Sequence, residues 1–169
     1  MTRKLKVVDF QRSAVYSWEA EEIRPHYPTG IPIEAISLVL SRASEVTGHK
    51  IEWEVNPRAT RWAWGGSHIT LPNPQKARWA YSVPVALHEA AHVVLQNINM
   101  TDAHGPRFVG LFLQLLRTCG GSRGKAHVGS WAQRAVERGI QLENMRSLVE
   151  HCVPAAATYG LDGSNSNGQ

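Results

Sequence analysis

The sequence of 169 residues has little of what marks several large classes of protein. It contains two cysteines, Cys119 and Cys152, which are too few for a disulfide framework, so we expect free thiols in a reducing compartment. No apolar run approaches the roughly 20 residues of a membrane span. The stretch from Leu5 to Phe10 is too short and too polar for the core of a signal peptide. These absences argue against a secreted or membrane-bound protein and predict a cytoplasmic one.

Charge is also sparse. Charged residues make up 19% of the chain and hydrophobic residues 43%, and the formal net charge is +4. This composition is typical of a folded globular domain, and the length suits one domain with its own core. No dense run of Lys and Arg occurs, so a nucleic-acid partner is permitted but not indicated. We expect a single domain over residues 1–160 and a disordered tail, rich in Gly, Ser and Asn, over residues 161–169.

The pattern that carries chemistry is His88-Glu89-Ala90-Ala91-His92, an H-E-x-x-H motif. Residues four apart lie on one face of a helix, so the imidazoles of His88 and His92 can close on one metal ion. Glu89 would lie beside the metal, where it could take a proton from a water molecule bound there. The alternative is that both histidines are ordinary hydrogen-bonded residues on a half-buried helix.

The context of the motif favours a helix. From Val85 to Gln96 there is no Gly or Pro, Pro84 suits a first turn, and Ser82 could cap the helix just before it. An apolar stripe at helical spacing consists of Leu87, Ala90, Ala91 and Val94. Because its two alanines are small, we expect this helix to approach a sheet closely.

Two histidines rarely complete a zinc site, so a third ligand is expected downstream. His104 comes next, directly before a helix that should begin at Pro106 and end near Gly120. At that position a loop reversal could return His104 to the first helix. Asp102 could orient a histidine or cap the second helix, and we favour the cap.

These two segments, HEAAH followed by HGPRF, resemble the zincin metallopeptidases and most of all the SprT-like (Spartan) group, which has an HExxH motif and then an HGPxF-type segment. They are also similar to a small family of actinobacterial and phage metallohydrolases. The resemblance covers Pro84 to Leu116. It implies Zn²⁺ held by His88, His92 and His104, with Glu89 as the catalytic base, and hydrolysis of a peptide bond in a peptide or protein substrate by zinc-bound water.

The fold class predicted is α+β and zincin-like, with a small twisted sheet packed on helices and the HExxH helix bordering a cleft. In zincins the strand before this helix is an edge strand that holds an extended peptide, and Ser67 to Leu71 takes that place here. The other elements expected are helices over 10–23, 33–47, 130–138 and 144–152, strands over 51–55 and 60–64, short strands over 5–9 and 140–142, and a loop over 122–129.

Several roles stay open at this stage. The donor that stabilises the oxyanion of a tetrahedral intermediate could be His127, Arg123 or Tyr81. Trp79, like Trp62 and Trp64, could line the cleft or fill the core.

Two alternative functions also remain. One is a zincin-fold binding protein without turnover, whose structural zinc would need a fourth ligand, with Asp102 the nearest candidate. The other, by resemblance to Spartan, is a protease acting on proteins bound to nucleic acid.

Overall fold

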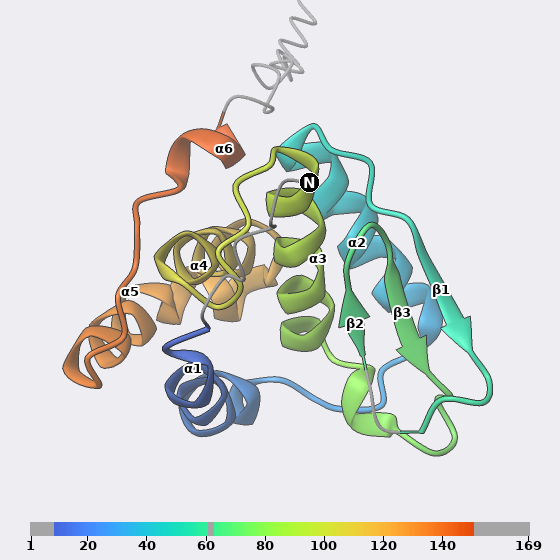
Figure 1. Cartoon of the computed structure of the whole chain (residues 1–169). Helices are drawn as coiled ribbons and strands as arrows, with labels where there is room; N and C mark the ends of the chain where they lie inside the picture. Colours follow the sequence, from blue (N-terminus) through green and yellow to red (C-terminus); the bar gives the residue numbers. More distant parts are fainter. Residues whose placement is uncertain (1–8, 61–62, 151–169) are drawn as a thin grey trace, which may run out of the picture.

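The computed structural model describes residues 9–60 and 63–150 of the chain. These residues form a mostly helical α+β fold with one small sheet (Figure 1), so the α+β part of the predicted fold class is confirmed. In the described ranges, no helix is long and apolar enough to cross a membrane. The expected tail over residues 161–169, and all but Asp9 of the strand expected over residues 5–9, lie outside the described residues.

The first helical segment changes its winding partway along. Helix α1 (Arg12–Trp18) runs into a π-helical turn, Glu19–Ile23, and then a 3₁₀ turn, Arg24–His26. A π-helical turn is wider than an α-helical one and is frequent at functional sites. Here it contains Glu19, which is fully buried. A helix over 10–23 was therefore predicted in the right place, but its change of winding was not.

Helix α2 (Ile33–Thr47) agrees with the prediction residue for residue. It ends at Gly48, whose φ of 68° is the left-handed conformation that glycine adopts at helix ends. Its apolar face, which includes Ile36 and Leu40, is buried in the common core. This helix packs against α3, described below, and so supports the helix that carries the motif.

The sheet has three strands, β1 (Trp53–Asn56), β2 (Trp64–Gly65) and β3 (Ile69–Pro72), in the order β1-β3-β2. Strand β3 pairs in parallel with β1 and antiparallel with β2. The prediction that residues 67–71 form an edge strand is therefore wrong, because β3 is central and β2 is the edge nearest α3 (Figure 1). Of the strand expected over 60–64, residues 61–62 lie outside the described residues.

Helix α3 (Val83–Asn97) lies between the sheet on one side and helix α4 on the other (Figure 1). Ala90 and Ala91 are fully buried, as expected for a helix that approaches its neighbours closely. Ser82 precedes the helix as predicted, but it does not cap it. Its hydroxyl instead donates to the Trp79 carbonyl at 3.4 Å.

Three helices follow: α4 (Pro106–Cys119), α5 (Gly121–Glu137) and α6 (Arg146–Glu150). The loop predicted over 122–129 is wrong, because α5 is helical from its first glycine. A Cβ on Gly124 would lie 1.8 Å from the Leu116 carbonyl oxygen, so glycine is required for α5 to pack on α4. The strand expected over 140–142 is also absent, and the Ile140 N–H instead bonds the Ala135 carbonyl at 2.9 Å.

Candidate metal centre

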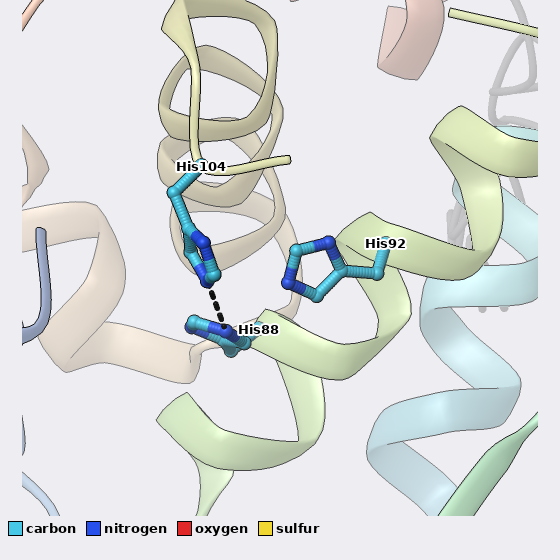
Figure 2. A group of neighbouring side chains, drawn as sticks. All are labelled: His88, His92 and His104. Carbon is cyan, nitrogen blue, oxygen red and sulfur yellow. Dashed lines mark hydrogen bonds between the residues drawn. The ribbon is translucent and has the colours of Figure 1, made fainter. Parts of the chain in front are cut away.

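The structure brings together the three histidines that the sequence singled out. His88 and His92 lie one turn apart on α3, and His104 reaches them from the loop before α4 (Figure 2). One ligand atom from each ring lies within 4.8 Å of the other two, and Nε2 of His88 is 3.3 Å from Nε2 of His104. Two nitrogens that each lie about 2.0–2.1 Å from a tetrahedral zinc ion are roughly 3.3–3.4 Å apart. This pair already has the separation that zinc requires.

The loop that presents His104 is fixed by Asp102. Its two carboxylate oxygens accept hydrogen bonds from the N–H groups of Arg107 at 2.8 Å and Phe108 at 3.2 Å, in the first turn of α4. Asp102 is therefore a helix cap, as predicted. The residue between Asp102 and the start of α4 must be a glycine, Gly105, because a Cβ there would lie 2.6 Å from an oxygen of the Asp102 carboxylate.

Two carboxylates that the sequence analysis missed hold the histidines from behind. Nδ1–H of His88 donates to Oε1 of Glu19 at 2.7 Å, and Nδ1–H of His104 donates to Oδ2 of Asp9 at 2.7 Å. The backbone N–H of His104 also donates to Asp9, at 3.3 Å. A proton on Nδ1 leaves the lone pair on Nε2, which is the atom that faces the other rings. Carboxylates in this position orient metal-binding histidines and raise their basicity.

Glu19 is itself balanced by a second charge. Its Oε2 lies 3.5 Å from Nη2 of Arg24, a contact that is an ion pair but lacks hydrogen-bond geometry. The Glu19 side chain is fully buried, whereas that of Arg24 is 35% exposed. A buried carboxylate needs such compensation, since an isolated charge in the interior is costly. His88 supplies it at Oε1 and Arg24 at Oε2.

The three imidazoles differ in how they titrate. Burial lowers the pKa of His88, but the charge and hydrogen bond of Glu19, with the charge of Glu89, outweigh it, so its pKa is raised. Burial lowers the pKa of His104, and the hydrogen bond that its ring donates to Asp9 offsets this only in part. Burial, and then the charges of His88 and His104, lower the pKa of His92 to about 2. His92 is therefore neutral near pH 7, the form that binds a metal.

Aromatic rings complete the surroundings. Tyr16 of α1 stacks on His88, with ring centroids 5.6 Å apart and an interplanar angle of 15°. Phe108 of α4 stacks on His92 at 4.4 Å and 25°. Packing of this kind restricts the rotation of each ring.

A pocket of about 290 Å³ opens beside His88. Glu89, whose exposed fraction is 8%, lines it together with His88, so the predicted base borders the space where a substrate could enter. Trp79 forms part of the pocket wall, which agrees with the alternative that it lines a cleft rather than fills the core. Trp62 and the side chain of Trp64 lie outside what the structure describes. The remaining lining residues are Arg12, Tyr16, Arg24, Ala63 and Val85.

The three candidates for the oxyanion donor are not brought to this pocket. The hydroxyl of Tyr81 donates to the Pro72 carbonyl at 2.7 Å in the core. His127 lies on α5, and its ring packs against the rings of His26 and Trp131. Arg123, also on α5, does not line the pocket. Tyr16, Arg12 and Arg24, which do line it, carry hydrogen-bond donors, and sequence spacing gave no indication of them.

No protein-family model, no curated protein and no solved structure shows a significant match to this chain. The case for a metal therefore rests on the donors themselves. Three imidazole nitrogens with lone pairs that converge from two directions form a set typical of zinc, and carboxylates behind two of them complete the arrangement. The residues present fit a zinc ion.

Proposed function

We propose that this protein is a zinc-dependent hydrolase that cleaves peptide bonds. The observation that carries the proposal is the convergence of His88, His92 and His104, with carboxylates behind two of them, next to a pocket that Glu89 lines. A cluster of histidines on a half-buried helix without a metal would not need this arrangement. In particular, it would not need two Nε2 atoms 3.3 Å apart, which is the separation of two nitrogen ligands on one zinc ion.

The chain's own residues divide the work. The three histidines hold the ion, which when bound would act as a Lewis acid toward water and the substrate carbonyl. Glu89 takes the proton from the attacking water and passes it to the leaving amine. Because Glu89 is only 8% exposed, little bulk water competes for its proton. Asp9 and Glu19 keep the rings of His104 and His88 in the orientation that binds the ion.

The coordination count supports a catalytic rather than a structural zinc. A structural zinc takes four protein ligands, whereas a catalytic one takes three and leaves a position open. Among the described residues, the cluster contains three histidines and no further His, Cys, Asp or Glu. Asp102, the nearest candidate for a fourth ligand, has both carboxylate oxygens bonded to the first turn of α4.

The choice of a peptide as substrate rests on the sequence resemblance to zincins and on the sheet edge beside α3. In the part of the chain that the structure describes, β2 pairs with β3 on one side only. An unpaired strand edge can add an extended peptide by backbone hydrogen bonds, with little demand on side chains. The edge that would do this is β2, not the strand over residues 67–71 that the sequence indicated.

The test combines metal analysis with a substitution of the base. We expect about one zinc per chain, lost in His88→Ala and in His92→Ala. Glu89→Gln should keep the zinc and the fold, because the amide has nearly the same shape. It should lower hydrolysis about 10²–10⁴-fold, because an amide cannot accept the proton. Glu21→Gln, an exposed carboxylate on the first helical segment, is the matched control.

The assay is turnover of a loosely folded basic protein, measured with and without DNA. Full activity in Glu89→Gln at undiminished zinc would rule out the mechanism, and wild-type protein that stays zinc-free in micromolar zinc would rule out the site. Turnover that appears only with DNA would favour action on nucleic-acid-bound proteins.

A further inference from the structure

We propose that the pocket beside the histidines selects substrates with a carboxylate next to the bond that is cleaved, and that Arg12 binds this carboxylate. The inference rests on the proposed function, since it names the substrate class of the same site. It starts from the residues that line the pocket. Most of them come from α1, the 3₁₀ turn Arg24–His26 and α3, and Ala63 and Trp79 come from the chain between β1 and α3.

Two arginines line the pocket, and they differ in whether an acidic side chain compensates their charge. Arg24 is paired with Glu19 at 3.5 Å, so its charge is largely compensated. No acidic side chain of the described residues forms an ion pair with Arg12. Its guanidinium lies 5.6 Å from the centre of the Tyr16 ring, and both residues line the pocket. The guanidinium also hydrogen-bonds the Tyr16 side chain, which leaves its other N–H groups available to a ligand.

The chemistry of a guanidinium defines the ligand. It is planar and always charged, and its paired N–H groups match a carboxylate with two parallel hydrogen bonds. Stacking on Tyr16 restricts its orientation, so less freedom is lost when a ligand binds. A bound zinc ion would add positive charge to the same space. Glu89 supplies the opposite charge at the base position, so an incoming carboxylate is directed away from Glu89 and toward Arg12.

The rest of the wall is apolar. Trp79, which is 41% exposed, lines the pocket together with Val85 and Ala63. These groups suit the methylene part of an acidic side chain, whereas an inorganic anion would gain nothing from them. The volume of about 290 Å³ is at the lower end of the roughly 300–1,000 Å³ of small-molecule sites, so it can hold one or two residues of a peptide. The carboxylate could be an acidic side chain or the C-terminus of a short peptide.

The experiment measures binding rather than turnover. Peptide hydroxamates carry their own zinc-binding group, so their affinity for the zinc-loaded full chain can be measured by calorimetry without any hydrolysis. Two matched compounds differ only by Glu or Gln in the residue next to the hydroxamate. A second pair differs only by a free or an amidated C-terminus. These pairs separate the two sources of the carboxylate.

We expect the carboxylate member of at least one pair to bind about ten- to hundredfold more tightly than its neutral partner, as for hydrogen bonds between charged groups. Arg12→Gln should reduce this preference to within about threefold. Arg58→Gln removes the same charge from another exposed arginine that does not line the pocket, so it should leave the preference unchanged. That control excludes a general effect of net charge.

Two outcomes would overturn the inference while leaving the proposed function intact. One is equal affinity for the charged and neutral members of both pairs. The other is a preference that survives in Arg12→Gln. If no hydroxamate binds although the protein holds zinc, the proposed function fails, and the inference falls with it.

Discussion

Glu19 offers the sharpest test of how the proposed metal site is held. It is fully buried, and its Oε1 accepts the hydrogen bond from Nδ1 of His88 at 2.7 Å. Glu19→Gln keeps an oxygen in this place but removes the negative charge. We expect the fold to survive, because His88 can become neutral and the side chain of Arg24, 35% exposed, is solvated. Zinc affinity should fall.

The size of the loss follows from the role of the carboxylate. Loss of a hydrogen-bonding partner behind a metal ligand typically costs about 10–100-fold in affinity, which is about 1.4–2.7 kcal/mol. Glu19 also raises the pKa of His88, so in wild-type protein a proton competes with zinc for this ring. That competition partly hides the loss at low pH. The measurement therefore belongs at an alkaline pH, where a proton competes less for this ring.

Competition with a fluorescent zinc chelator gives the dissociation constants directly. Glu21→Gln is the control, because Glu21 lies two residues away and pairs instead with Arg138, at 2.8 Å on the surface. A Glu19→Gln protein that binds zinc as tightly as wild type would refute the reasoning. So would an equal loss in Glu21→Gln, since the effect would then be one of net charge.

Two further predictions concern the loop and the free thiol. His104→Ala should weaken zinc binding by orders of magnitude. Asp102→Ala should affect zinc binding far less. It should lower the free energy of unfolding, measured in urea, by about 0.5–2 kcal/mol, because it removes the cap of α4. If Asp102→Ala loses zinc and His104→Ala does not, both proposed roles are wrong. Burial raises the pKa of the Cys119 thiol to about 11, so iodoacetamide at pH 8 should modify it at least tenfold more slowly in folded than in urea-unfolded protein, as followed by mass spectrometry. Equal rates in the two states would show that the thiol is accessible and ordinary.

The parts of the site that depend on local geometry could be predicted. The spacing of His88 and His92 sets them on one face of α3, and Pro106 marks the start of α4 and so the position of His104. The bounds of α2 followed from its apolar spacing and from Gly48. These features are determined by residues within a few turns of one another.

The errors arose where the packing of distant segments decides the structure. The glycines of α5 indicated a loop, but Gly124 is there to let the helix approach Leu116 of α4. The alternation of residues in a strand reports which side chains are buried, not which neighbours the strand pairs with. The alternation could therefore not predict that β3 is the central strand of the sheet.

The carboxylates behind the histidines show the same limit. Glu19 and His88 are 69 residues apart, and Asp9 and His104 are 95 apart. A usable indication existed for one of them. Glu19 is four residues after Val15 and directly follows Trp18, so it falls on the buried stripe of the first helical segment. A carboxylate on a buried stripe needs a partner, and an unexplained one is a candidate to support a metal ligand. Asp9 had no comparable context.

The first helical segment and the residues just before it contact the histidines directly, so they form part of the proposed site. Asp9 and Glu19 contact His104 and His88, while the amide of Gln11 donates to the carbonyls of His104 and Gln141 at 2.8 and 3.0 Å. Bound zinc would pull the same two histidines together from the other side. Because the ion and the carboxylates act on the same rings, each favours the position that the other needs. The binding of zinc and the docking of α1 would therefore be thermodynamically coupled, and a change that loosens α1 should weaken zinc binding even when none of the three histidines is replaced.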